Sequence, residues 1–316
     1  MTKTDELERQ KKARLDIAPD QPKLASRIDQ MQAVDPEPLR ETVGDLRPAR
    51  GRADLKRPNF SAPVPANGYA LWYIEGSSLC GKYQTAVIGR VGSALSHKSI
   101  WKGARRLADE VSIQVKIDGP GGRRYAQSPR KALSQRTASR LEVGTSMMRW
   151  DNGDLIIDID MIRPSLTNRR IAGQITLSPS AVTQWELALS PHHIWRPFAP
   201  HCQIAVDLDQ PLESWRGHGY FDAYFGGCAL DDEFDSWRCD TERTSTSVTI
   251  GHAAIALDGG AHHSTYRFDA GGKAQAVAPE SAPALTARLA KGVRLDQRWR
   301  LLYAASARSR AHWRLK

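Results

Sequence analysis

A dense group of aromatic, acidic and histidine side chains lies in the segment 215–227, WRGHGYFDAYFGG. If this segment is a strand, alternate side chains share a face, so Tyr220, Asp222 and Tyr224 lie together with His218. A carboxyl group among aromatic rings on an inward face is desolvated, and desolvation favours its protonated form. A carboxylic acid that is protonated at neutral pH can donate a proton. The pattern therefore predicts Asp222 as a general acid.

Aromatic side chains around this acid are suited to stabilising a positive charge. The segment 192–200, HHIWRPFAP, adds His193 and Trp195 a short distance upstream. The face of an aromatic ring attracts a cation by about 0.5–2 kcal/mol. An acid beside several ring faces could donate a proton and stabilise a carbocation. A purely structural interpretation also stays open. In it, the aromatic strand is a wall of a β-barrel and the Asp222 carboxylate caps a turn.

Motifs for other kinds of chemistry are absent from the sequence. It contains no G-x-S-x-G nucleophile elbow and no H-E-x-x-H zinc motif, and the glycines of GPGGRR at 119–124 lack the spacing of a phosphate loop. The four cysteines, Cys80, Cys202, Cys228 and Cys239, form no C-x-x-C pair, which predicts reduced structural thiols. We therefore expect neither a metal nor a cofactor.

The elements that must position these residues are predicted to be strands. From Gly68 onward, short β-branched and aromatic runs are separated by Gly, Pro and Asn, as at the Asp151–Gly153 turn. We expect an all-β fold of two lipocalin-like antiparallel β-barrels, one over 58–196 and one over 197–316. The preceding residues, 1–57, have mixed charge and no aromatic side chain, which predicts a largely disordered or partly helical extension.

Composition and charge limit the location and the partners. The chain has 316 residues, 41% hydrophobic and 25% charged, without a run of about 18 apolar residues or an apolar N-terminal signal, so we expect a cytoplasmic protein. The net charge is +10, and segment 288–316 has nine basic residues, one acidic residue and several aromatics. We expect this segment to contact the anionic inner membrane peripherally, and we expect no nucleic acid. A solvated basic strand is the alternative.

Several ordered motifs resemble those of one known family. They include ANGYALWYIEG, AVIGRVGSALS and DGPGGRRYA, then H-x-W-x-P-x-A-P from His193 to Pro200 and W-x-G-x-G-Y-x-D from Trp215 to Asp222. The chain resembles the carotenoid 1,2-hydratases, also called hydroxyneurosporene synthases, of the AttH-like, two-barrel lipocalin-related superfamily. The resemblance covers about Asn59 to Asp240 and is fairly specific, because the motifs occur in register.

The resemblance implies a cofactor-independent hydratase. Such an enzyme protonates the terminal double bond of an acyclic carotenoid, of the lycopene or neurosporene type, and captures the tertiary cation with water. By position in the motifs, Asp222 corresponds to the catalytic acid, Tyr220 and Trp195 to cation-stabilising aromatics, and His193 to a polar partner. We expect the isoprenoid to lie in an elongated apolar cavity. Its expected binding residues are Trp72, Trp215, Tyr224, Phe225 and His218.

The chain departs from the family pattern directly after the acid. Where the family usually has a polar residue and then Asn, this sequence has Ala223 and Tyr224. An Asn at the second position could orient water, so its loss affects capture of the cation more than protonation. Two alternatives therefore remain. The first is an isoprenoid or meroterpenoid cyclase that uses the same acid, and the second is a non-catalytic lipocalin-like carrier of a hydrophobic ligand.

Overall fold

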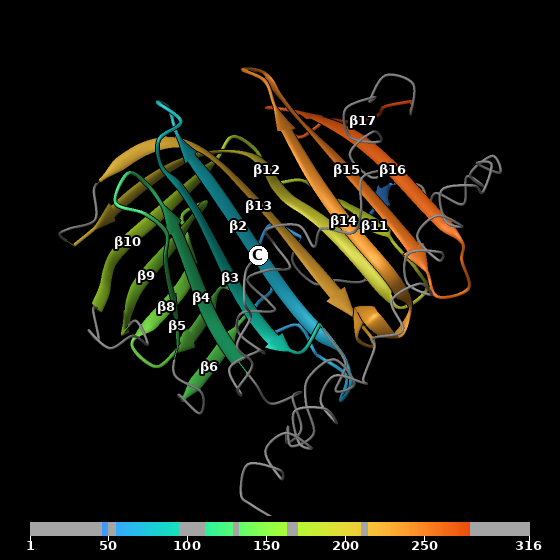
Figure 1. Cartoon of the computed structure of the whole chain (residues 1–316), viewed down its shortest axis with the longest axis horizontal. Coiled ribbons are helices and arrows are strands. Elements are labelled where there is room, and N and C mark those ends of the chain that lie inside the picture. Colours follow the sequence, from blue (N-terminus) through green and yellow to red (C-terminus); the bar gives the residue numbers. More distant parts are fainter. Residues whose placement is uncertain are drawn as a thin grey trace, which may run out of the picture. The chain divides into compact units, whose positions relative to one another are not determined.

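The described part of the chain is almost entirely β-structure. The structure, a computed structural model, describes residues 46–49, 55–94, 111–128, 133–162, 170–209 and 214–278 (Figure 1). Within these ranges the one helical element is a 3-10 turn, η2 (Leu230–Asp232), and the strands pair in antiparallel fashion. The predicted all-β class is confirmed. None of these residues belongs to a helix long and apolar enough to span a membrane.

The strands of these ranges form two sheets. The larger sheet contains β1 (Arg47–Pro48), β2 (Tyr69–Ser78), β3 (Gln84–Gly92), β4 (Val111–Asp118), β5 (Arg124–Gln127), β6 (Ser134–Thr137), β7 (Arg140–Val143), β8 (Ser146–Asp151), β9 (Asp154–Ile162), β10 (Arg170–Pro179), β11 (Trp185–Ala188), β12 (His193–Leu208) and β13 (Trp215–Gly226). Its main path runs β5-β4-β3-β2-β13-β12-β10-β9-β8-β7-β6, and β11 pairs with β12 and β1. The smaller sheet contains β14 (Phe234–Arg243), β15 (Ser247–Ala256), β16 (Ala261–Asp269) and β17 (Ala274–Ala276), in that order. The neighbouring strands β2, β13 and β12 thus bring distant parts of the sequence together.

The hairpin between β8 and β9 forms at the turn that the sequence predicts. Asn152 and Gly153 have φ angles of 49° and 92°. Two consecutive positive φ angles match a type I′ turn, whose twist suits the flanking strands. After the turn, Leu155, Ile157 and Ile159 alternate with more exposed residues, and all three are buried. Alternation and turn chemistry together set the register of this hairpin.

Two prolines disturb the pairing of β12 without ending the strand. Pro197 and Pro200 have no N–H to donate to a neighbouring strand. The register between β12 and β13 shifts twice between Arg196 and Cys202, as it does at β-bulges. The expected domain boundary after residue 196 therefore falls inside a continuous strand.

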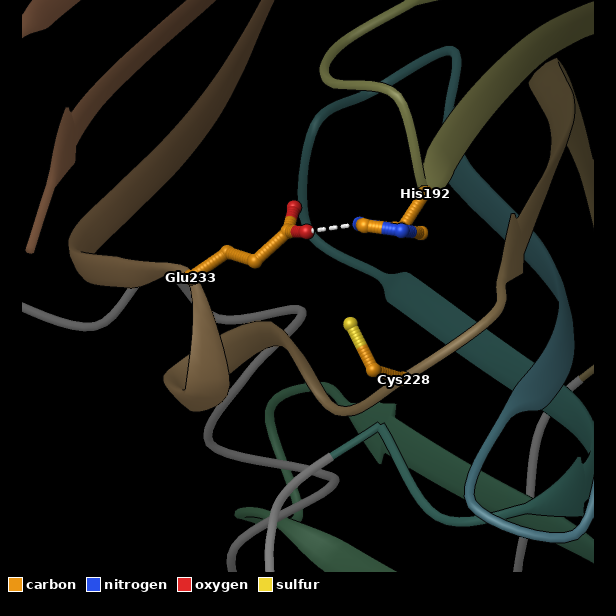
Figure 2. A group of neighbouring side chains, drawn as sticks. All are labelled: His192, Cys228 and Glu233. Atoms are coloured by element: carbon orange, nitrogen blue, oxygen red, sulfur yellow. Dashed lines mark hydrogen bonds and ion pairs between the residues drawn. The ribbon is translucent and has the colours of Figure 1, made fainter.

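The link from β13 to β14 passes close to the beginning of β12. The link contains Cys228 and η2 and ends at Glu233. The side chains of Cys228 and Glu233 lie beside that of His192, the residue directly before β12 (Figure 2). The backbone N–H of Gly227 donates to the carbonyl of His192 at 2.8 Å. This contact joins the beginning of one central strand to the end of another.

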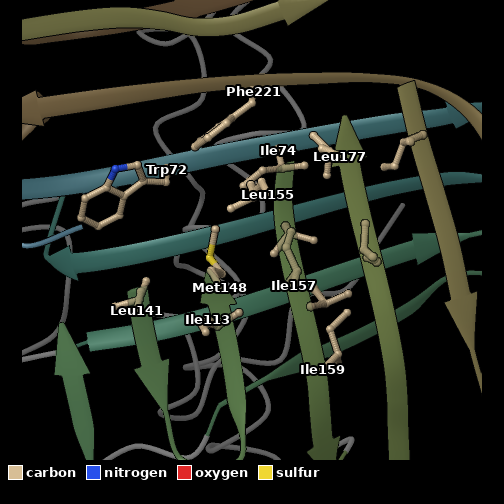
Figure 3. Packing of buried hydrophobic residues seen from close by; sticks show 14 of the residues in the cluster. Trp72, Ile74, Ile113, Leu141, Met148, Leu155, Ile157, Ile159, Leu177 and Phe221 are labelled. Carbon is tan, nitrogen blue, oxygen red and sulfur yellow. The ribbon is translucent and has the colours of Figure 1, made fainter. Parts of the chain in front are cut away.

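One face of the larger sheet forms the main apolar core. The sheet curls like half of a barrel, so that side chains from its two ends face one another (Figure 3). Trp72 and Phe221, from the central strands, belong to the same fully buried cluster as Ile113, Met148 and Ile157. Burying each such side chain contributes about 1.5–3 kcal/mol to folding.

The other face of the central strands packs against the smaller sheet. Tyr73, Trp195 and Tyr224 of the larger sheet share a buried cluster with Ile250 and Phe268 of the smaller sheet. This packing removes water from part of the face. The central strands are therefore buried on both sides, and each side has its own cluster of residues.

Two expectations concern the ends of the chain. Within the predicted N-terminal extension, Arg47 and Pro48 form β1 and pair with Glu186 and Trp185 of β11. The basic segment 288–316, from which we expect membrane contact, lies outside the described residues.

Candidate active site

Asp222 lies in β13, between β2 and β12. Its side chain has no solvent exposure. Across the strands, Asp222 is opposite Tyr73 of β2, and Trp195 of β12 is opposite Tyr224. The period-two alternation of β13 places Tyr220 and Tyr224 on the same face as Asp222, the face that packs against the smaller sheet.

Three hydrogen bonds converge on one oxygen of the Asp222 carboxyl group. Oδ2 accepts from the Tyr220 hydroxyl at 2.5 Å, the Tyr224 hydroxyl at 2.8 Å and Trp195 Nε1 at 3.0 Å. All four side chains are buried. Hydrogen bonds to an ionised carboxylate are roughly twice as strong as those between neutral groups. The three donors therefore fix the orientation of the carboxyl group and stabilise its anion once a proton has left.

The smaller sheet adds two rings to this hydrogen-bonded cluster. His252 of β15 lies 4.3 Å from Trp195 between ring centroids, and Trp237 of β14 lies 5.3 Å from Tyr224. Trp237 and His252 stack at 5.7 Å with an interplanar angle of 11°. Sequence reasoning missed His252. Its strand shows ordinary alternation, and its neighbours come from another sheet, so no local signal distinguished it.

A polar cavity of about 550 Å³ lies beside the cluster. Tyr220 and the exposed His218 line it, together with charged groups that include Lys116 and Arg243, whereas Asp222 is not among its lining residues. This lining differs from the apolar cavity expected from the sequence. The reason is that the positions of β2, β3 and β4 that face the cavity carry polar side chains as well as apolar ones. Tyr220 is therefore the group that connects the cavity to Asp222.

Glu75 is the carboxylate of this cavity that lies nearest to Tyr220 in register. It is directly opposite Tyr220 in the pairing of β2 with β13. Glu75 accepts hydrogen bonds from the Tyr73 hydroxyl and from Thr241 Oγ1, both at 2.8 Å. Because Thr241 belongs to β14, Glu75 also links the two sheets.

His193 lies at the end of the site face, away from the acid. It is opposite Gly226 in register, four residues beyond Asp222. Its Nδ1 hydrogen-bonds with the Tyr69 hydroxyl at 3.1 Å, and its Nε2 lies 3.4 Å from Glu233 Oε2. Burial lowers the pKa of His193 to about 4, so the ring is neutral at pH 7. Its surroundings are those of a fixed neutral imidazole.

Three expected substrate-binding residues lie on the other face of the larger sheet. Trp72 and Phe225 form an edge-to-face pair at 6.2 Å, and Trp72 Nε1 donates to the carbonyl of Pro58 at 3.0 Å. Trp215 stacks against Tyr83 at 6.4 Å. Because alternate residues of a strand point to opposite faces, the sheet separates these rings from Asp222. The structure brings together Tyr220, Tyr224 and Trp195 with the acid, but not these three.

Proteins named as carotenoid hydratases are similar to this chain in sequence. The model of the family described as carotenoid hydratase CrtC matches residues 87–300. The chain is 32% identical over 245 residues to an acyclic carotenoid 1,2-hydratase of Thiocapsa roseopersicina, covering 75% of this chain and 58% of that protein. It is 33% identical over 195 residues to an acyclic carotenoid 1,2-hydratase of Cereibacter sphaeroides, covering 61% of this chain and 70% of that protein.

The matches have limited extent. The chain spans a little over half the length of the Thiocapsa roseopersicina relative. Among solved structures, it is similar to a putative AttH from Nitrosomonas europaea, with a TM-score of 0.48 and 14% identity over 67% of this chain and 68% of that chain.

Proposed function

Because the chain belongs to the carotenoid hydratase family, CrtC, we propose that it adds water to the terminal C1–C2 double bond of an acyclic carotenoid. The observation that supports this proposal best is the buried carboxyl group of Asp222, with three donors on a single oxygen. Protonating an alkene carbon needs a desolvated acid whose conjugate base is stabilised within the site. The Asp222 cluster meets both needs.

The first step is transfer of a proton from Asp222 to the alkene. In this proposal the reacting carboxyl group is protonated, and its acidic proton is on Oδ1 because Oδ2 accepts the hydrogen bonds from Tyr220, Tyr224 and Trp195. Its transfer forms a C2–H bond, breaks the C1–C2 π bond and leaves a tertiary cation at C1. Negative charge develops on the carboxylate at the same time. The hydrogen bonds from Tyr220, Tyr224 and Trp195 strengthen as it does, which lowers the barrier.

Aromatic rings then stabilise the cation. Trp195 and Tyr220 hydrogen-bond to the acid, and Trp237 packs against the third donor, Tyr224. Each ring face that meets the cation contributes about 0.5–2 kcal/mol. The cavity next to Trp237 and His252 measures only about 30 Å³, which is too small for an isoprenoid end group. Entry of an isoprenoid end group on this side therefore requires the smaller sheet to move relative to the larger one.

Water reaches the cation from the polar cavity. Glu75 and Tyr220 are opposite each other in register and line the same cavity. A water molecule that hydrogen-bonds with Glu75 would therefore lie beside Tyr220. Its oxygen forms a bond with C1, and the proton it releases returns to the Asp222 carboxylate. This transfer restores the neutral acid, so the net reaction consumes one alkene and one water. In this proposal Glu75 takes over the water-orienting task of the Asn that the chain lacks.

Isotope labelling tests the reaction. The purified chain is incubated with detergent-solubilised lycopene or neurosporene in water enriched in oxygen-18, and separately in heavy water. A hydratase incorporates oxygen-18 at C1 and one deuterium at C2. A product that carries deuterium but no oxygen-18, and has one more ring, would replace hydration by cyclisation. Tight binding of the carotenoid with no product would indicate a carrier.

Cyclisation is the second candidate function, and one observation favours it. Tyr224 stands where the family usually has Asn, and its hydroxyl donates to Asp222 instead of facing water. A tyrosine hydroxyl that donates to the carboxyl group does not orient a water toward the cation, so the cation could react with an internal double bond. The isotope experiment separates the two outcomes.

A further inference from the structure

Four potential metal ligands meet where β12 begins and the β13–β14 link ends. A ring nitrogen of His192, Cys228 Sγ and a carboxylate oxygen of Glu233 all lie within 4.8 Å of one another. Figure 2 shows the three side chains converging from two segments of the chain. His193 Nε2 lies 3.6 Å from Cys228 Sγ and 3.4 Å from Glu233 Oε2. We call these four residues the His–Cys–Glu cluster.

Two separations in this cluster, both measured from His193 Nε2, match those of ligands around a tetrahedral metal ion. Zinc binds Cys sulfur at about 2.3 Å and His nitrogen or carboxylate oxygen at about 2.0–2.2 Å, so the ligands of one tetrahedral site lie roughly 3.3–3.7 Å apart. The two distances from His193 Nε2, 3.4 and 3.6 Å, fall in this range. His192 and Glu233 are hydrogen-bonded to each other and have only to separate slightly to share an ion.

Neighbouring groups hold the ligands in a suitable orientation. With its proton on Nδ1, the His193 ring donates to the Tyr69 hydroxyl and presents the lone pair of Nε2 to the cluster. The Ser190 hydroxyl donates to Glu233 Oε2 and accepts from the backbone N–H groups of His192 and His193. Metal-binding histidines almost always have such a partner on the second ring nitrogen.

We propose that His192, His193, Cys228 and Glu233 form a binding site for a divalent transition-metal ion of the zinc type. The mixture of imidazole, thiolate and carboxylate ligands suits zinc rather than magnesium or calcium, which prefer oxygen ligands. Four protein ligands close the coordination sphere, which is typical of a structural ion. The ion would clamp the beginning of β12 to the link after β13. Trp195, two residues after His193 in β12, would be held in place to donate to Asp222.

Metal content and a spectroscopic probe test the site. The purified chain is stripped with a chelator, dialysed against Zn²⁺ and analysed by mass spectrometry for metal, with one zinc per chain expected. Titration with Co²⁺ should produce the thiolate-to-cobalt charge-transfer absorption that reports a bound cysteine. Zinc should also raise the Tm of the stripped chain, because binding to the folded state stabilises it.

Variants assign the ligands. Cys228→Ser should remove the charge-transfer band and lower zinc affinity by more than about tenfold, since even the loss of a supporting residue typically costs tenfold or more. Cys80→Ser, at an exposed thiol in the β2–β3 turn, is the matched control and should leave binding unchanged. His192→Ala removes a largely exposed side chain, so its loss of affinity is measurable in a folded chain. The proposal is overturned by a stripped chain that binds no zinc, or by Cys228→Ser and His192→Ala proteins that bind it like the unmodified chain.

Discussion

The two faces of β13 differ in the contacts that their side chains make. On one face Phe221 and Ala223 join the apolar core, where neighbours are aliphatic and aromatic groups. On the other face Tyr220, Asp222 and Tyr224 form a hydrogen-bonded group. Both faces are buried, so burial alone does not distinguish packing from chemistry. The difference lies in the partners: Phe221 and Ala223 pack against apolar groups, whereas the Tyr220 and Tyr224 hydroxyls both donate to the Asp222 carboxyl group.

In the proposed mechanism, one face of this strand serves stability and the other serves catalysis. Changes on the core face should lower the free energy of unfolding, and changes on the site face should lower the rate of reaction. Substitutions on the two faces of β13 and β2 therefore test the proposal directly.

The largest effect is expected for Asp222→Asn. The amide has nearly the same shape but cannot protonate carbon, so turnover should fall by about 10²- to 10⁴-fold. Conversion of lycopene to its 1-hydroxy product measures the change, and Asp258→Asn, at an exposed turn, is the control. Full activity of the Asp222→Asn protein would eliminate the mechanism.

Phe221→Ala should have a comparably large effect on stability instead. The ring is fully buried in the core, and removing such a ring costs about 3–5 kcal/mol. Chemical denaturation measures the loss. The turnover rate of the fraction that stays folded should change far less than in Asp222→Asn. An unaltered unfolding midpoint would contradict the assignment of this face to the core.

Removal of single hydroxyl donors should have intermediate effects. Tyr220→Phe and Tyr224→Phe each keep the ring and delete one hydrogen bond to the carboxylate, a loss of about 1.5–3 kcal/mol, or roughly ten- to a hundredfold in rate. Tyr220 also lines the cavity that supplies the water in the proposed mechanism, so Tyr220→Phe should have a lower kcat than Tyr224→Phe. Steady-state kinetics on the two purified variants decides this. Equal rates would show that facing the cavity has no catalytic consequence.

The smallest effects are expected for neighbours in β2. Glu75→Gln keeps the shape of the side chain but accepts hydrogen bonds more weakly, so kcat should fall by about two- to tenfold. Ile74→Val, on the core face, should cost about 0.5–1.5 kcal/mol of stability with kcat unchanged. Measuring kcat and the unfolding midpoint for both variants compares the faces within one strand. A reversed pattern would show that the faces are assigned incorrectly.

Much of the site strand could be predicted from the sequence, because its geometry is local. Side chains of a strand alternate with period two, so Tyr220, Asp222 and Tyr224 had to share a face once the segment was extended. The same rule separates Phe225 from Tyr224. The alternation of side chains does not say which face of a strand packs on the core. For this reason the sequence predicts Trp72 and Phe225 as substrate-binding residues, although both lie on the face away from Asp222.

Other features depend on which distant segments become neighbours. Trp195 donates to Asp222 because β12 pairs with β13, and Glu75 faces the cavity beside Tyr220 because β2 pairs with β13 from the other side. His252 reaches Trp195 only through the packing of a second sheet.

The all-β class, the Asn152–Gly153 hairpin and the aromatic face around Asp222 can be predicted from the sequence, since they follow from backbone sterics and side-chain alternation over a few residues. The third donor to the acid, the polar lining of the cavity and the contact of His192 with Cys228 and Glu233 depend on the tertiary fold. Each of these joins residues tens of positions apart. Their contact depends on strand order and sheet packing, and the burial of many apolar side chains selects that arrangement collectively.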